Sequence, residues 1–149
     1  MQTFLPYPNS YSSAIVLDNR RLGKQRVEAL QIAECLLVKE SHWKNHPAVL
    51  MWKDYVPYLV RVYIPAIMGE WLGRGYNNTK CGEKWVNLSA IVFNEKIMKP
   101  HWLNEDFCIR HQSNLLRKDK NYYGPLFPNV PDNLEYIWPI RKGVEYENY

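Results

Sequence analysis

The chain has 149 residues and a formal net charge of +4, with 46% hydrophobic and 14% aromatic residues. A chain of this length can bury a core, and this composition excludes a disordered protein. The longest apolar stretch, 55–68, is too short and too interrupted to span a bilayer, and residues 1–9 do not resemble a signal peptide. We therefore expect one domain over residues 1–149, no membrane partner, and a cytoplasmic location.

The N-terminal third predicts an extended arm followed by a helix. Residues 1–9 contain two prolines, which disfavour a helix, and the serines after them offer N-caps for a helix that begins near Ala14. This helix should include Leu17–Gln31, because apolar residues recur there at helical spacing. Gly23 weakens the helix and so predicts a close packing contact. The predicted buried stripe consists of Leu22, Ala29, Leu30, Ala33, Leu36 and Leu37.

Proline positions define the second helical span. Pro47 is suited to the first position of a helix, and the helical pattern continues over Ala48–Leu72. Pro57 and Pro65 should kink or divide that span, and the glycines that follow Leu72 should end it.

The remaining segments predict two more helices and an irregular tail. Helices are expected over Trp85–Met98 and over Cys108–Arg117. The tail 122–149 contains four prolines and many tyrosines, so it should wrap the core as irregular structure. No segment alternates as a strand does. The predicted fold class is therefore all-α, a compact single-domain helical bundle with an extended N-terminal arm and an irregular Pro/Tyr-rich C-terminal tail.

Cysteine and histidine spacings do not indicate a metal site. The three cysteines include no C-x-x-C pair, and Cys35 lies in an apolar helical run, where it should be buried. His42 and His46 have the i,i+4 spacing of some zinc enzymes but lack the glutamate of H-E-x-x-H. We expect no metal and no cofactor, and we expect His46 to cap a helix or contact a ligand.

The first helix carries a crowded basic cluster. Its charged residues include Arg20, and Arg21, Lys24 and Glu28 share one face, with Gln25 and Gln31 beside them. Arg26 lies closer to the apolar stripe, where it needs a buried partner or must reach a ligand. One interpretation is a solvated face with a Lys24–Glu28 ion pair. The other is a polyanion partner, because four basic residues within seven positions repel one another.

A second basic cluster lies some 80 residues further along the chain. Amide and hydroxyl side chains among its cations suit phosphate and base contacts, although a polar loop around a helix end is an alternative. The cluster consists of Arg110, His111, Arg117, Lys118 and Lys120, interleaved with Gln112, Ser113 and Asn114. Most aromatic residues, such as Trp52 and Trp71, fall at core spacings. The candidates for base stacking are Tyr122, Tyr123 and Phe127.

Several segments follow the pattern of a known family. They are Leu17-Asp18-x-x-Arg21-Leu22-x-x-x-x-x-Glu28, His46 at the start of a helix, and Glu70-Trp71-x-x-Arg74-Gly75-Tyr76. These segments resemble the pyrimidine-dimer DNA glycosylase (phage endonuclease V-like) family. The opening Met1–Tyr7 and the runs Arg20–Glu28, Asn45–Ala48 and Ser113–Lys118 resemble a separate branch of that family.

The resemblance implies an all-helical protein that bends duplex DNA and extrudes a nucleotide. In that family the α-amine attacks the sugar C1′ and releases the base through a Schiff base, assisted by a helix carboxylate. Glu28 falls on the position of that carboxylate. The bulky side chain of Gln2 predicts that Met1 is retained. The attacking group is therefore the Met1 amine, Lys24, or water activated by Glu28.

We thus expect a monomeric DNA glycosylase that excises a damaged or modified base, with an associated abasic-site lyase activity. Its expected location is nucleoid-associated or inside a host cell. The expected catalytic residues are Glu28, Met1 and Lys24, and the expected DNA-binding residues are Arg20, Arg21, Arg26, His46, Arg117 and Lys118. Two alternatives remain from the residues alone. They are a non-catalytic nucleic-acid-binding module and an N-glycosidic hydrolase of free nucleosides or nucleotides.

Overall fold

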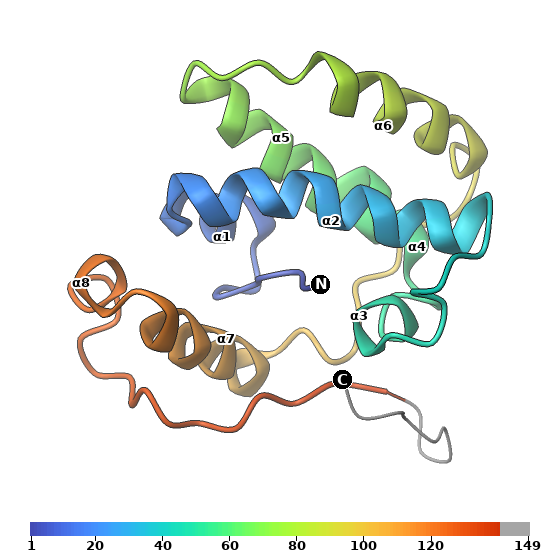
Figure 1. Cartoon of the computed structure of the whole chain (residues 1–149). Helices are drawn as coiled ribbons and strands as arrows, with labels where there is room; N and C mark the ends of the chain where they lie inside the picture. Colours follow the sequence, from blue (N-terminus) through green and yellow to red (C-terminus); the bar gives the residue numbers. More distant parts are fainter. Residues whose placement is uncertain (141–149) are drawn as a thin grey trace.

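A computed structural model describes residues 1–140, and this part contains helices and no strand. The all-α prediction is confirmed. Helix α2 crosses the middle of the molecule, with α5 and α6 on one side and α3, α7 and α8 on the other (Figure 1). The helices are α1 (Ser10–Val16), α2 (Asn19–Leu37), α3 (Pro47–Leu50), α4 (Val56–Tyr58), the π-helical turn η1 (Leu59–Tyr63), α5 (Ile64–Gly73), α6 (Thr79–Ile91), α7 (Glu105–Lys118) and α8 (Lys120–Tyr123).

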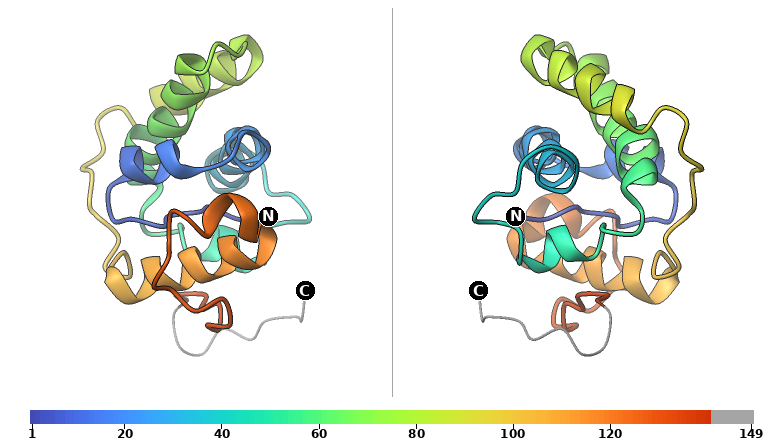
Figure 2. Two further views of the ribbon diagram at one scale, coloured as in Figure 1. Left: turned by 90° about the vertical axis from the view of Figure 1, so that its left-hand side faces the viewer. Right: turned by 90° about the vertical axis from the view of Figure 1, so that its right-hand side faces the viewer.

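The extended N-terminal arm passes between α2 and α7 (Figures 1 and 2). An extended backbone cannot pair its own N–H groups, so buried side chains must accept from them. The Phe4 N–H donates to Gln25 Oε1 at 2.8 Å, and the Leu5 N–H donates to His111 Nδ1 at 2.9 Å. The arm is therefore fixed to both helices and lies inside the fold.

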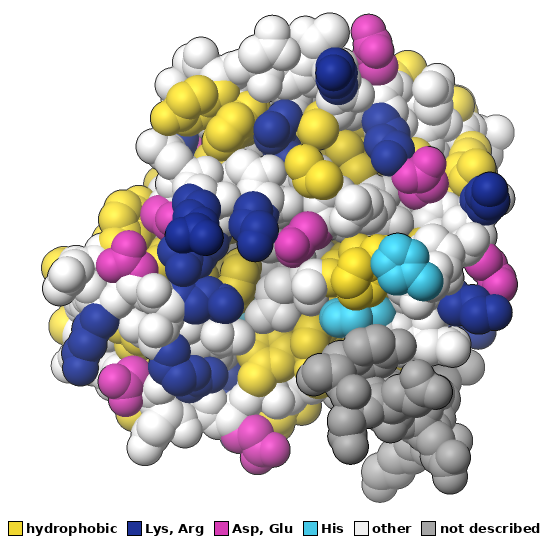
Figure 3. Space-filling model, viewed as in Figure 1, with side chains coloured by type: hydrophobic (Ala, Val, Ile, Leu, Met, Phe, Trp, Pro, Cys, Tyr) yellow, Lys and Arg dark blue, Asp and Glu magenta, His cyan; other side chains and the backbone are white. Residues whose placement is uncertain are grey.

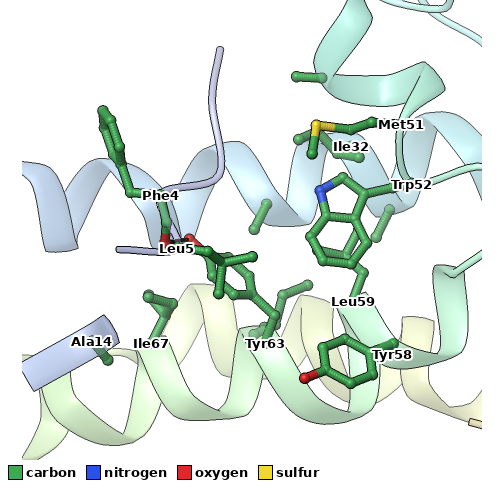
Figure 4. Packing of buried hydrophobic residues seen from close by; sticks show 14 of the residues in the cluster. Phe4, Leu5, Ala14, Ile32, Met51, Trp52, Tyr58, Leu59, Tyr63 and Ile67 are labelled. Carbon is green, nitrogen blue, oxygen red and sulfur yellow. Dashed lines mark hydrogen bonds between the residues drawn. The ribbon is translucent and has the colours of Figure 1, made fainter. Parts of the chain in front are cut away.

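The hydrophobic core forms where the arm meets α2, η1 and α5 (Figure 4). Trp52 and Tyr63 are fully buried there, and the Trp52 indole N–H donates to Thr3 Oγ1 at 3.0 Å. The prediction that Trp52 belongs to the core is confirmed. Figure 4 shows the arm contributing Phe4 and Leu5 to this cluster.

The first predicted helix is two helices. We predicted a continuous helix from Ala14 through Gln31, but the chain is extended at Leu17 and Asp18, so α1 ends and α2 starts anew. Leu17 is fully buried, and the Asp18 carboxylate contacts Arg21 and the Tyr123 hydroxyl instead of capping its own helix. These tertiary contacts cause a break that local spacing does not show. Helix α2 continues to Leu37, in agreement with the predicted apolar stripe, which runs to that residue.

The prolines divide the second helical span as predicted. Pro47 is the first residue of α3, and Pro57 and Pro65 lie in the first turns of α4 and α5. A proline ring collides with the carbonyl four residues earlier in a regular α-helix. Directly before Pro65 the chain forms the wider π-helical turn η1. This turn changes the position of that carbonyl relative to the Pro65 ring. Helix α5 ends at Gly73, and the nearby Gly75 has a positive φ of 90°.

Helix α6 lies earlier in the chain than predicted. It spans Thr79–Ile91 rather than Trp85–Met98. The Asn77 side chain accepts from the Thr79 N–H at 2.9 Å, which starts the helix early. Arg61 donates to the Glu95 carbonyl at 2.9 Å and holds the following segment outside the helix. Both contacts use side chains whose role the apolar pattern does not show.

The last predicted helix and the tail agree largely with the structure. Helix α7 contains the predicted Cys108–Arg117 and extends it at both ends. Residues 124–140 form no helix, as predicted, but Tyr122 belongs to the short helix α8. The part of the predicted tail from 141 to 149 lies outside the described residues. None of the helices in the described range has the length and apolar character that crossing a bilayer requires.

Candidate active site

A pocket of about 410 Å³ opens between the arm, α2, α7 and the tail. Figure 3 shows that lysine and arginine side chains gather on the face where α2 and α7 lie. The arm contributes Met1, Gln2 and Phe4, α2 contributes Arg20, Arg21, Lys24, Gln25 and Glu28, α7 contributes Asn114 and Lys118, and the tail contributes Tyr136 and Trp138. The pocket thus combines cations, one carboxylate, amides and aromatic rings.

The pocket brings together residues from both basic clusters of the sequence. All three expected catalytic residues line it, and so do three of the expected DNA-binding residues. They are Met1, Lys24 and Glu28, and Arg20, Arg21 and Lys118. Helix α7 lies across the arm from α2, so the fold joins clusters that are far apart in the sequence. The other three expected DNA-binding residues lie outside the pocket.

Glu28 is bound to the backbone of the arm. Its Oε2 accepts a hydrogen bond from the Gln2 N–H at 3.1 Å. Only the Met1 backbone separates that nitrogen from the Met1 α-amine, so covalent geometry limits the amine to about 7 Å or less from Oε2. Within the described range no ion pair joins Glu28 to Lys24, so the structure does not support the interpretation of this face as a solvated surface with that pair.

Arg21 is oriented by a contact between the start of α2 and the end of α8. Its guanidinium Nη1 lies 3.2 Å from Asp18 Oδ2, and the Tyr123 hydroxyl donates to the same carboxylate. Burial, with Asp18 as a further influence, raises the pKa of Tyr123 well above its ordinary value, so this hydroxyl stays a donor. The contact limits the positions that the Arg21 side chain can take at the edge of the pocket.

The predicted base-stacking aromatic residues are mostly unavailable for that role. Tyr123 is fully buried, and Phe127 is 4% exposed and stacks on Tyr123 with parallel rings. The prediction for these two residues is wrong because the tail folds back onto α8 and buries both rings. Tyr122 is 41% exposed but does not line the pocket.

Arg26 points away from the pocket, toward α5 and α6. Its guanidinium carbon lies 4.4 Å from the centroid of the Trp71 ring, and its Nη1 donates to Asn78 Oδ1 at 3.0 Å. Because Arg26 lies near the apolar stripe, the sequence predicted that it needs a partner. Trp71 and Asn78 are its partners. The contacts of Arg26 therefore stabilise the packing of helices and do not support the expected role in DNA binding.

Arg117 holds the tail against α7. Its Nη1 lies within hydrogen-bond distance of the Asp132 and Leu134 carbonyls, at 2.8 and 3.0 Å, and of Ser113 Oγ at 3.1 Å. These acceptors bind the Arg117 guanidinium at the edge that would contact a phosphate. Arg117 thus positions the segment that leads to Tyr136, whereas Lys118, next to it, reaches the pocket.

His46 caps α3 beside the pocket. Its Nδ1 accepts from the Ala48 N–H at 3.0 Å, so the expectation that His46 caps a helix is confirmed. Burial, and after it the charge of the α-amino group, lower the pKa of His46. The His46 ring meets Trp138 edge to face, with centroids 5.8 Å apart. His46 therefore supports the Trp138 wall from behind and is itself outside the lining.

Among the lining residues, sequence reasoning did not select Gln25, Tyr136 or Trp138 as part of the site. Gln25 looked like a polar residue beside the catalytic face, and no periodic pattern pointed to Tyr136 or Trp138 in the tail. Their positions depend on contacts such as those of Arg117, which no local signal shows. Across residues 1–140 no group of three histidine, cysteine or acidic side chains is arranged to hold a metal.

Comparison with known families gives one match. The model of the family described as pyrimidine dimer DNA glycosylase matches residues 1–82. This range includes the arm and the whole of α2, and therefore most of the residues that line the pocket. No curated protein and no solved structure gives a significant match.

Proposed function

The chain belongs to the pyrimidine dimer DNA glycosylase family, and we propose that it excises a damaged pyrimidine from duplex DNA in the pocket between α2 and α7. The observation that carries this proposal is the shared location of the Met1 amine, Glu28 and the cations of both basic clusters. A solvated helix face would not need a carboxylate fixed to the start of the chain. The pocket volume falls within the range of small-molecule sites.

The cations are suited to bind the DNA backbone around an extruded nucleotide. Arg20, Arg21 and Lys24 line one side of the pocket and Lys118 lines the other. Phosphates of the strand would contact both sides while the damaged nucleotide occupies the space between them. Such contacts release counterions, so affinity should fall steeply as salt rises.

The Met1 amine and Glu28 provide a nucleophile and a carboxylate. The amine nitrogen attacks C1′, the glycosidic bond breaks, and its electron pair leaves with the base, which takes up a proton. Glu28 stabilises the positive charge on the sugar and accepts a proton from the attacking nitrogen. The sugar ring then opens as the C1′–O4′ bond breaks and O4′ takes up a proton, which gives the protonated Schiff base. This Schiff base makes a C2′ proton acidic, and its removal by Glu28 would eliminate the 3′ phosphate and cleave the strand. Lys24 and water are the competing nucleophiles.

Borohydride trapping tests the nucleophile. The protein is incubated with duplex DNA that carries a cyclobutane thymine dimer, and the adduct is digested and analysed by mass spectrometry. The cyclobutane ring keeps the detached thymine joined to its 3′ neighbour, so base release from this duplex means cleavage of the glycosidic bond, measured as strand breaks after alkali. We expect the trapped sugar on the peptide that begins at Met1. Trapping on Lys24 would assign the nucleophile to that side chain, and Lys24→Arg should then abolish the adduct. Base release without any adduct would indicate attack by water.

The substitution Glu28→Gln tests the catalytic carboxylate. We expect base release to fall by about 10²–10⁴-fold, the range typical of a lost general acid or base. Duplex binding should remain. Glu34→Gln is the matched control, because Glu34 lies on the same helix but pairs with Lys84 outside the pocket. Undiminished release by Glu28→Gln would remove Glu28 from the mechanism.

The same assays separate the two alternative functions. A non-catalytic binding module would show salt-sensitive affinity and no released base. A hydrolase of free nucleosides would release base without a duplex and with little dependence on salt. Either result would contradict the proposal.

A further inference from the structure

The side-chain amide of Gln25 has only one possible orientation. Gln25 is 1% exposed, and its Oε1 accepts from the Phe4 N–H at 2.8 Å and from the Tyr63 hydroxyl at 2.7 Å. A backbone N–H can only donate, so the oxygen and not the nitrogen of the amide must face Phe4. The arm therefore fixes the Gln25 oxygen inward.

The amide nitrogen of Gln25 is left for a ligand. Gln25 lines the pocket, and its Nε2 has no hydrogen-bond partner among residues 1–140. Unlike the fully buried polar atoms that lack a partner, this nitrogen is open to the pocket, so an acceptor on a ligand can bind it there. Since Oε1 is already occupied, Gln25 can offer a ligand hydrogen-bond donors and no acceptor.

Tyr136 provides a second unpartnered polar group at the same place. Its hydroxyl is buried and has no hydrogen-bond partner within the described chain, and its ring lines the pocket. Burial raises the pKa of Tyr136 well above its ordinary value, so the hydroxyl keeps its proton. Burial, and after it the neighbouring Tyr136 and Glu28, also raise the pKa of Tyr63. The Tyr136 hydroxyl thus lies near the same polar cluster that holds Gln25.

We propose that Gln25 is a specificity-determining residue whose amide N–H donates to an exocyclic carbonyl oxygen of the base in the pocket. The proposal rests on the proposed function and names its substrate class, a base of the thymine or uracil type with an oxo group at that position. The bidentate contact of glutamine with adenine needs a free side-chain oxygen, which Gln25 lacks. A base with an exocyclic amine there would face the Gln25 donor with another donor. The Tyr136 hydroxyl is closed off from the pocket space, so Tyr136 contacts the base only through its ring.

The test is the substitution Gln25→Glu, because the two side chains have nearly the same shape. A carboxylate oxygen still accepts from Phe4 and Tyr63, so the arm stays in place, but the donor that faces the pocket becomes an acceptor. We expect release from duplex DNA with a thymine dimer to fall by about tenfold to a hundredfold at pH near 8. Binding to the same duplex with a tetrahydrofuran abasic analogue should change by less than about twofold, because that duplex has no base for Gln25 to contact.

Two controls separate the lost donor from the added charge. Gln31→Glu adds the same charge at an exposed position on the same helix and should leave release unchanged. Lowering the pH protonates the carboxyl group that Gln25→Glu introduces and returns an O–H donor to the pocket. The activity of the Gln25→Glu protein, divided by that of the wild type at the same pH, should therefore rise as the pH falls.

Three results would overturn the inference. The first is equal release by Gln25→Glu and wild type. The second is a loss of binding to the tetrahydrofuran duplex as large as the loss of release from the thymine-dimer duplex. The third is a ratio of Gln25→Glu activity to wild-type activity that does not change with pH. A wild-type protein that releases no base from the thymine-dimer duplex defeats the proposed function and this inference with it. A wild type that releases base beside an equally active Gln25→Glu defeats the inference alone.

Discussion

Helix α2 has two sides with similar residues and different environments. On the side of the arm and α7, Arg20, Arg21 and Lys24 line the pocket. On the side of α5 and α6, Arg26 lies over Trp71 and binds Asn78. Positive charge is therefore a property that both sides share, and packing decides which cations are available to a ligand. The pocket side depends on the arm, and the packed side depends on Trp71.

The largest expected effect concerns His111, which holds the arm on the pocket side. Burial lowers the pKa of His111 from 6.5 to about 3. Between these values the unfolded chain binds a proton at His111 and the folded protein does not, so stability is full above pH 6.5 and falls as the pH decreases. This loss should reach about 2–3 kcal/mol between pH near 6.5 and 4.5.

Urea unfolding of the variant His111→Asn at several pH values measures this loss. Asparagine can still accept from the Leu5 N–H but does not titrate, so its stability should depend less on pH than that of the wild type. His42→Asn, at an exposed position, is the control and should keep the wild-type dependence. Equal pH dependence in His111→Asn and wild type would show that His111 does not govern it.

The packed side should respond to Arg26→Met mainly through stability. The change removes the cation–π contact and the bond to Asn78, while the buried Nε that has no partner offsets part of the loss. We expect the free energy of unfolding to fall by about 2 kcal/mol. The dependence of DNA affinity on salt should stay as in the wild type. A reduced salt dependence would place Arg26 on the DNA and contradict the comparison.

Gly23→Ala tests how closely Trp71 approaches α2. A Cβ at Gly23 would lie 3.0 Å from the Trp71 ring, which is also stacked on Tyr76 and cannot easily move. We expect a loss of about 1–2 kcal/mol by thermal unfolding. Gly69→Ala is the matched control, because a Cβ there meets nothing within 4 Å and should stabilise helix α5 by up to about 1 kcal/mol. If Gly23→Ala is more stable than the wild type, the Trp71 ring can move away from the added Cβ.

The smallest expected effect is that of Arg21→Gln on the pocket side. Removing one phosphate contact should weaken duplex binding by about 1 kcal/mol and reduce the salt slope by about one charge. Stability should fall by at most about 1 kcal/mol. The ion pair with Asp18 is largely shielded from water, with side chains 17% and 14% exposed, but glutamine can still donate a hydrogen bond to that carboxylate. Fluorescence anisotropy at several salt concentrations measures the slope. An unchanged slope would mean that Arg21 does not contact phosphate.

The sequence predicted the helices of the pocket better than their surroundings. Arg21, Lys24 and Glu28 share a face because helical spacing is a local property, and the structure places all three at the pocket. The predicted close packing at Gly23 is confirmed by the Trp71 contact. The break at Leu17 and the burial of Tyr123 were missed, because both arise from contacts with residues far away in the sequence.

By itself, the sequence determined an all-helical chain, an arm that cannot be helical, and one helix face with a carboxylate among cations. These follow from proline geometry and helical periodicity, which need no knowledge of other segments. Only the tertiary structure decided that Arg26 is held by Trp71, that Arg117 holds the tail, and that the Gln25 oxygen is taken by Phe4. A hydrogen-bonding group is available to a ligand only when no neighbour has used it, and those neighbours come from distant parts of the chain.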